Sequence, residues 1–202
     1  MGPSGVRRLR ALRRQLASDS TPAADSSAPF VPEPALTGGE VFALWPEDSP
    51  FIDRSRAHLP EDYNPNAAPG SPPAGVVNQV RGVHNPSCEV HRPTASSNGV
   101  AVLLVPGGGH NQLGVANCVS LVPFFGALGA TTIIIRPRLR FDGYNMTTDA
   151  VFDVQQAIRI TRAHATEWHL DPLKIGVLGF SAGAELATVR TPPPPQCSWG
   201  FR

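Results

Sequence analysis

Three kinds of feature are scarce in this 202-residue chain, and each scarcity excludes a class of protein. Cysteine occurs only at positions 88, 118 and 197, and so odd and sparse a count excludes a disulfide framework. No run of roughly 18 apolar residues occurs, so we expect no membrane span. The net charge of +1 favours no partner of either sign, and we expect the body of the chain not to bind nucleic acid.

Acidic residues are absent before Asp19, whereas five arginines lie within the first fourteen residues. An Arg-rich, acid-poor start with apolar residues at near-helical spacing is typical of an organelle transit peptide. A disordered basic tail is an equally good interpretation, so organelle and cytoplasm both stay open as compartments. A segment rich in Ser, Pro and Ala follows, and we therefore interpret residues 1–37 as a basic leader and linker.

The second half of the chain alternates apolar runs with helical patterns. Strands are predicted over 100–105, 131–136 and 174–179, because runs this apolar are typical of parallel strands covered on both faces. Helices are predicted over 117–130 and 149–170. This alternation predicts an α/β fold, with a mostly parallel sheet and helices on both of its faces.

Some local details of this pattern are specific enough to be checked. The helix predicted over 149–170 has one apolar face and ends near an Asp-Pro pair. Its candidate N-caps are Thr147, Thr148 and Asp149. Upstream, a short strand is predicted over 41–45, and two more over 76–83 and 88–93, on either side of a turn at Asn85–Pro86.

A nucleophile motif follows the last predicted strand. Gly179, Phe180, Ser181, Ala182 and Gly183 match G-x-S-x-G between a strand and a helix, which is the context that makes this short motif informative. The turn holds the serine in a strained conformation with its hydroxyl exposed, and the two flanking glycines avoid a collision. Ser181 is therefore the candidate nucleophile, and the N–H of Ala182 is a candidate oxyanion donor aided by the helix dipole. A serine in an ordinary glycine-flanked turn is the plainer interpretation.

A glycine-rich turn, PGGGH, follows the strand predicted over 100–105. Glycines let the main chain approach a substrate closely with its N–H groups turned inward. The Gly107–Gly109 loop is therefore the candidate second half of an oxyanion hole, with Gly108 and Gly109 as donors. His110 either lines the pocket or lies in solvent, and we favour solvent.

The same turn lacks what a nucleotide site requires. Gln112 stands where a dinucleotide-binding loop has its third glycine, and no Lys-Ser or Lys-Thr pair follows as in a P-loop. His84, Cys88 and His91 could suggest zinc, but no second ligand pair stands at a suitable spacing. No metal or nucleotide site is predicted.

The chain resembles the acetylxylan-esterase-like, BD-FAE-like group of α/β-hydrolases over residues 40–188. The segments that carry the resemblance, in order, are VFALWPEDSP, EVHRPT, VLLVPGGGH, RPRL and DVQQAIRITRAHATEWHLDPLKIGVLGFSAGAELA. The resemblance implies an α/β-hydrolase domain over 38–190, a small-molecule or carbohydrate ester as substrate, and no cofactor. It also implies that Ser181 is the nucleophile of a serine hydrolase. Ala184 and Glu185 stand where this group often has a glycine and a histidine.

The triad partners of such a hydrolase follow the serine as an acid and then a histidine. After Ser181 the chain has one acid, Glu185, and no histidine. Glu185 lies one helical turn past the serine, too near to orient a distant histidine, so an earlier histidine would have to serve by convergence. We therefore expect that the C-terminal part of the fold is missing, that residues 191–202 form an irregular Pro-rich tail, and that the chain lacks an assembled triad.

Three functional hypotheses stay open at this point. The first is an ester hydrolase, the second a non-catalytic fragment or pseudoenzyme that acts as a binding module, and the third a serine peptidase of the prolyl-oligopeptidase type. Without later strands, the strand at 174–179 becomes a sheet edge. An unpaired apolar edge favours self-association.

Overall fold

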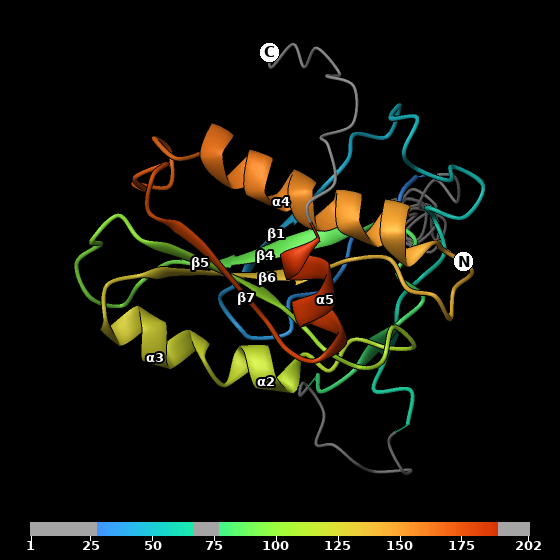
Figure 1. The fold of residues 1–202 in the computed structure, drawn as a ribbon, viewed down its shortest axis with the longest axis horizontal. Helices are drawn as coiled ribbons and strands as arrows, with labels where there is room; N and C mark the ends of the chain where they lie inside the picture. The colour runs from blue at the N-terminus through green and yellow to red at the C-terminus, as the bar shows by residue number, and fades with distance from the viewer. Residues whose placement is uncertain (1–27, 67–76, 190–202) are drawn as a thin grey trace, which may run out of the picture.

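The computed structural model describes residues 28–66 and 77–189. The leader predicted within residues 1–27 and the tail predicted for residues 191–202 lie outside the described residues. The described chain contains a five-stranded sheet, a separate two-stranded ribbon, and helices on both faces of the larger sheet (Figure 1).

The five-stranded sheet has the order β1–β4–β6–β5–β7. Three strands run parallel, namely β6 (Thr131–Arg136), β5 (Ala101–Val105) and β7 (Ile175–Gly179). β4 (Ser87–His91) and β1 (Glu40–Ala43) continue the sheet antiparallel beyond β6. The parallel strands lie where their apolar runs predicted them, and every residue of β6 is buried.

Helices cover both faces of this sheet (Figure 1). A π-helical turn, η1 (Met146–Ala150), leads directly into α4 (Val151–Ala163), which lies on one face together with α5 (Ala182–Thr188). The opposite face is covered by α2 (Ala116–Val119) and α3 (Val122–Ala127). In the described ranges, no helix is both long and apolar enough to span a bilayer.

Each face of the sheet buries its own apolar cluster. Side chains alternate between the faces along a strand, so Leu103 of β5 packs with the cluster under α4, whereas Leu104 packs with Cys118 under α2. Both leucines are fully buried. A strand covered on both faces therefore needs an unbroken apolar run, which is why the sequence pattern located these strands.

The predicted start of the long helix is wrong by a few residues. The N-cap is Asn145, whose side-chain oxygen accepts a hydrogen bond from the N–H of Thr147 at 2.9 Å. The candidates Thr147, Thr148 and Asp149 lie inside η1 instead. The reason is that the π-helical turn precedes the apolar periodicity on which the prediction depended.

The two strands predicted around Asn85–Pro86 both form, but they belong to different sheets. β3 (Val80–Arg81) pairs with β2 (Asp62–Tyr63) in the two-stranded ribbon, whereas β4 pairs with β1 and β6 in the main sheet. The turn therefore leads from the ribbon into the main sheet.

Residues 28–37 had been assigned to a linker on composition, yet they lie against the domain. The N–H of Phe30 donates to the carbonyl of Ala57 at 2.8 Å. The N–H groups of Ala35 and Leu36 donate to the carboxylate of Glu89 at 2.7 and 3.1 Å. A carboxylate of β4 thus holds a Pro-rich segment that has no periodic signal of its own.

Glu89 is also the centre of a buried charge cluster. Arg136 donates to Glu89 at 2.8 Å and to Glu61 at 2.9 Å, and His91 Nε2 lies 2.7 Å from Glu89 Oε1. Burial raises the pKa of Glu61, which keeps one carboxylate oxygen without a partner in the described chain. Burial also acts on Glu89, but the hydrogen bonds from His91 and Ala35 and the charge of Arg136 outweigh it and lower the pKa of Glu89. One guanidinium is therefore shared by two unequal carboxyl groups.

Among the described residues, β7 lies at one end of the main sheet and pairs only with β5. Its apolar residues Val177 and Leu178 are 37% and 38% exposed, and Leu173 just before the strand is 93% exposed. An apolar strand with one free edge is therefore open to solvent.

Candidate active site

The turn between β7 and α5 carries Ser181 in an unusual backbone conformation. Its φ is +48° and its ψ is −119°, a region that residues with a Cβ rarely adopt. The N–H of Gly183 donates to the carbonyl of Phe180, and the N–H of Ala184 to that of Ser181, each at 2.8 Å. These bonds close the turn tightly and leave the Ser181 side chain exposed.

Both glycines of the G-x-S-x-G motif are required sterically, because a side chain at either position would collide with main-chain atoms. A Cβ on Gly179 would lie 2.5 Å from the carbonyl oxygen of Gly183. A Cβ on Gly183 would lie 2.5 Å from the carbonyl oxygen of Pro106. Because the obstacles are main-chain atoms, neither position accepts a side chain without movement of the backbone.

The Gly107–Gly109 loop reaches the serine turn by main-chain contact. A Cβ on Gly107 would lie 2.7 Å from the carbonyl oxygen of Phe180 and 3.3 Å from Cβ of Ser181. The loop is fixed from behind, because the carbonyl of Gly107 accepts from the N–H of Gly114 at 2.8 Å. The two glycine-rich segments that the sequence singled out, 74 positions apart from Gly107 to Ser181, are therefore neighbours.

Several main-chain donors at this junction are free. Among the residues the structure describes, the N–H groups of Gly108, Gly109 and Ala182 are recorded with no acceptor. The positive φ angles of Gly108 (+131°) and Gly109 (+64°) turn the loop sharply at this point. These three N–H groups are the ones that the sequence singled out as candidate oxyanion donors.

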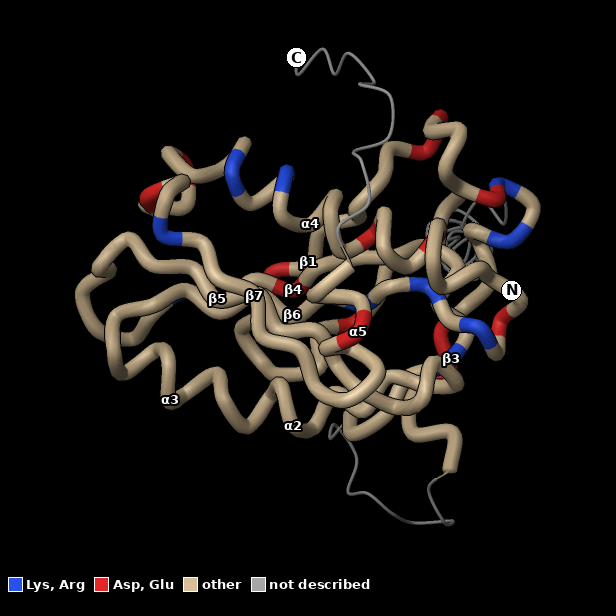
Figure 2. The backbone as a smooth tube through the Cα atoms, in the orientation of Figure 1, with Lys and Arg blue, Asp and Glu red and all other residues tan. Residues whose placement is uncertain are grey.

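Charged side chains are almost absent around this junction. The sequence has no Lys, Arg, Asp or Glu between Arg92 and Arg136, and Figure 2 shows the corresponding part of the backbone, with α2 and α3, free of either colour. Glu185, in the first turn of α5, is the acidic residue nearest to Ser181 in sequence. Arg138 also lines the cavity of the site, but its guanidinium is paired with Asp153 at 2.8 Å.

His110 does not lie in solvent, and that prediction is wrong. Its side chain is 9% exposed, and its Nε2 lies 3.0 Å from Oε2 of Glu185. The inward direction follows from its backbone, which adopts a left-handed φ of +61° directly after the glycines. Glu185, the one acid after Ser181 in the chain, therefore contacts a histidine that is not bonded to the serine. No spacing rule could have found this pair, because 75 positions separate its members.

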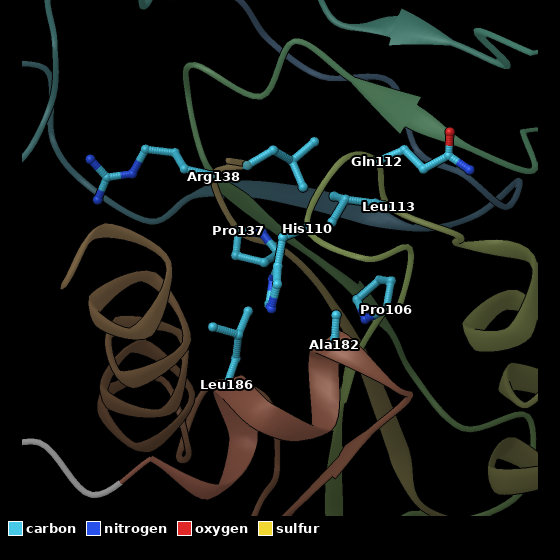
Figure 3. Close-up of a pocket in the computed structure, with 10 residues that line it drawn as sticks. Pro106, His110, Gln112, Leu113, Pro137, Arg138, Ala182 and Leu186 are labelled. Carbon is cyan, nitrogen blue, oxygen red and sulfur yellow. The ribbon is translucent and has the colours of Figure 1, made fainter. Parts of the chain in front are cut away.

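A small cavity lies where the loop, the end of β6 and α5 meet (Figure 3). Its interior volume is about 10 Å³, which is room for a single water molecule. The ring of His110 points into it near Pro137 and Leu186, whereas the side chain of Arg138 points away, toward Asp153 at 2.8 Å. Its walls are mostly apolar and include Ala182, but Ser181, Gly108 and Gly109 do not line it.

Ser181 forms no hydrogen bond with a histidine within the described ranges. His84 bonds instead to the hydroxyl of Tyr144 at 3.0 Å, and His91 to Glu89. The described chain thus brings a glycine-rich loop against the serine turn, without a histidine hydrogen-bonded to the serine.

The residues considered for zinc do not converge. No group of three or more His, Cys, Asp or Glu in the described segments could hold a metal ion. His84 and His91 bond to different partners, and Cys88 is buried in β4. Burial raises the pKa of Cys88 and of Cys118 to about 12, so neither thiol is ionised near neutral pH.

Comparisons with known proteins agree on one family. The BD-FAE family model matches residues 89–191. An acetylxylan esterase of Xylanibacter ruminicola is 32% identical over 93 residues, which are 46% of this chain and 19% of that protein.

Solved structures of one esterase are also similar to this chain. Esterase 2 of Thermogutta terrifontis with propionate bound is 26% identical, with a TM-score of 0.51 over 57% of this chain and 44% of that one. The same esterase phosphoramylated by tabun aligns with 76% of this chain and 47% of that one, at 22% identity and a TM-score of 0.52. The chain therefore spans less than half the length of these esterase structures and about a fifth of the acetylxylan esterase.

Proposed function

Because this chain belongs to the BD-FAE family, we propose that it is a serine hydrolase of carboxylic esters with Ser181 as its nucleophile. Its fold is that of the α/β-hydrolases. One observation carries the proposal: Ser181 sits at φ +48° on a strand-to-helix turn, in main-chain contact with a glycine loop whose N–H groups are free. An ordinary turn serine needs neither the strained backbone nor the cradle.

In the proposed reaction, the serine turn supplies the nucleophile and the glycine loop helps to stabilise the negative charge. Oγ of Ser181 attacks the ester carbonyl, its proton passes to a general base that the described residues do not supply, and the negative charge on the carbonyl oxygen is held by the N–H groups of Ala182, Gly108 and Gly109. The carbonyl then re-forms as the C–O bond to the alcohol breaks and the base returns the proton to the alcohol oxygen, which leaves an acyl-serine. Water attacks that acyl group in the same way, releases the acid and restores the hydroxyl.

The acyl group is inferred from the relatives and not from the cavity, whose interior of about 10 Å³ holds no more than one water molecule. One relative is an acetylxylan esterase, and a solved structure of a similar esterase holds propionate. We therefore propose a small-molecule or carbohydrate ester with an acyl group of a few carbons as the substrate.

A fluorophosphonate probe tests the nucleophile directly. The probe should label the chain at Ser181, and Ser181→Ala should abolish labelling, whereas Ser120→Ala, which changes an exposed serine at the end of α2, should leave it intact. Labelling should weaken when p-nitrophenyl acetate competes, and less so with longer acyl chains. A chain that melts cooperatively but takes up no probe would refute the proposed activity.

That negative result would support a second candidate, a non-catalytic hydrolase-fold module that binds a ligand or partner. The observation in its favour is that the Ser181 hydroxyl forms no hydrogen bond with a histidine in the described residues. A serine without a base is a weak nucleophile, although its oxyanion cradle could still hold a carboxylate.

We also propose that the free edge of β7 favours self-association of this chain. Val177 and Leu178 are partly exposed there, and main-chain groups on one side of the strand have no partner strand in the described chain. Sedimentation velocity should show concentration-dependent association, which Val177→Lys on the same strand should reduce. A preparation that stays monomeric at every concentration would contradict this.

A further inference from the structure

The hydrogen bond between His110 and Glu185 joins the two halves of the site. His110 follows the glycine loop directly, whereas Glu185 lies one turn after Ser181 on α5, and its N–H approaches the carbonyl of Ser181 at 3.4 Å. No other side-chain hydrogen bond recorded in the described chain links residues 107–110 to α5. The pair therefore connects the loop that carries the proposed oxyanion donors to the helix that follows the nucleophile.

His110 is itself held firmly on the loop side. Its carbonyl accepts from the N–H of Arg140 at 2.9 Å and from that of Phe141 at 3.3 Å, so the segment after β6 fixes its backbone. Its ring is confined between Pro137 and Leu186 (Figure 3). Because the ring has little freedom to move, its hydrogen bond to Glu185 restrains the loop, which a bond from a flexible surface side chain would not do.

The carboxylate also has an electrostatic reason to be held. Negative charge develops beside Ser181 in the proposed reaction, and a free carboxylate one helical turn away would oppose it. The Nε2–H of His110 holds the carboxylate of Glu185 at 3.0 Å and so offsets part of its charge.

We propose that His110 and Glu185 are positioning residues, whose hydrogen bond fastens the Gly107–Gly109 loop to the helix that follows the nucleophile. This inference rests on the proposed function for its consequence in catalysis. The bond itself can be tested without any activity, because it should restrain the loop in the free protein.

The test compares hydrogen exchange in the full 202-residue chain and its variants. The reporters are two amides that donate into the loop region, those of Asn111 and Arg140. Glu185→Ala and His110→Leu remove one partner each, and loss of a hydrogen bond of ordinary strength should speed exchange of both amides about fivefold. The amide of Asp171, which bonds to Gly99 elsewhere in the chain, should not change.

Two further variants distinguish positioning from mere packing. His110→Gln keeps an N–H near the position of Nε2, so it should restore near wild-type exchange, although it loses the ring. Glu167→Ala is the matched control, because Glu167 is also an exposed carboxylate bound to a histidine, His164, at 2.7 Å. It should leave both reporter amides unchanged.

The rate of fluorophosphonate labelling at Ser181 forms the second readout. It should fall in Glu185→Ala and His110→Leu, and recover in His110→Gln. Unchanged exchange in Glu185→Ala, or a His110→Gln variant as impaired as His110→Leu, would overturn the positioning role. If the wild type is never labelled, the proposed function fails, whereas the exchange measurements still decide the pair. Because Glu185 is 72% exposed, its variant keeps the test open even if His110→Leu does not fold.

Discussion

Two histidine–glutamate pairs in this molecule have nearly the same geometry and opposite surroundings. His91 and Glu89 lie 2.7 Å apart with side chains 6% and 0% exposed, whereas His110 and Glu185 lie 3.0 Å apart with side chains 9% and 72% exposed. Glu89 also accepts two main-chain N–H groups and a guanidinium. Only His110 is recorded as bonded to the carboxylate of Glu185 in the described chain.

The difference shows that a contact distance does not reveal what a pair does. The buried pair His91–Glu89, here called the inner pair, belongs to a network that joins β4, β6 and the segment 28–37, so its loss would leave buried charge uncompensated. The pair His110–Glu185, here called the outer pair, has water as an alternative partner for its carboxylate, so its loss changes stability little. What the outer pair can change is the position of a loop beside Ser181. The inner pair thus acts on the fold, and the outer pair on the site.

The largest effect should follow from breaking the inner pair. Glu89→Gln removes the carboxylate that Arg136 and His91 share, and we expect a loss of about 3–5 kcal/mol in the free energy of unfolding, measured with urea. The variant should also release the N–H groups of Ala35 and Leu36, which exchange of these amides would report. A loss no larger than that of a surface substitution would mean that the inner and outer pairs are energetically alike.

Lowering the pH should change the stability contributed by Glu89 and by Glu61 in opposite directions. The pKa of Glu89 lies below its ordinary 4.5, so its contribution is complete above pH 4.5 and is lost as the pH falls through its folded pKa. The stability gap between wild type and Glu89→Gln should therefore narrow below pH 4.5. The pKa of Glu61 is raised, so its contribution is present below pH 4.5 and is lost as the pH rises through its folded pKa.

Urea unfolding across the acid range, with Glu61→Gln beside Glu89→Gln, checks this opposition. The gap for Glu61→Gln should change with pH in the direction opposite to that for Glu89→Gln. If the two stability differences from wild type changed in the same direction with pH, the opposite pKa shifts of Glu61 and Glu89 would be contradicted.

Gly107→Ala should show how sensitive stability and labelling of Ser181 are to a steric clash in the loop. The added Cβ would lie 2.7 Å from the carbonyl of Phe180, and we expect a loss of about 1–3 kcal/mol in stability. A misplaced loop should also slow labelling of Ser181 by about 100-fold. Gly114→Ala is the matched control on the same loop, since its nearest neighbour would be 3.6 Å away. Equal behaviour of the two variants would argue against a close approach at Gly107.

The smallest effect on stability should come from the outer pair. Glu185→Ala truncates an exposed side chain, and we expect the free energy of unfolding to change by no more than about 0.5 kcal/mol. Thermal unfolding beside Glu167→Ala would measure it, and both variants should resemble wild type. A loss comparable to that of Glu89→Gln would show that the outer pair stabilises the fold rather than the site.

Local sequence patterns predicted much of this architecture. β5 and β6 were predictable because strands covered on both faces require unbroken apolar runs. β7 carries a similar apolar run and forms where it was predicted, but its middle residues are exposed. The serine turn was predictable because strand, glycines and helix are contiguous in sequence. The N-cap at Asn145 was missed, because a π-helical turn does not follow the period of 3.6 residues on which the prediction depended.

By itself, the sequence determined where the parallel strands lie and where the chain turns at the serine, since apolar runs and glycine placement are properties of neighbouring residues. Only the tertiary structure decided which distant groups meet. It placed Glu89 on residues 35 and 36, assigned β3 and β4 to different sheets, and brought Glu185 to His110. The physical reason is that a hydrogen bond between distant residues depends on how sheet and helices pack, and no local pattern encodes a distance across 75 positions.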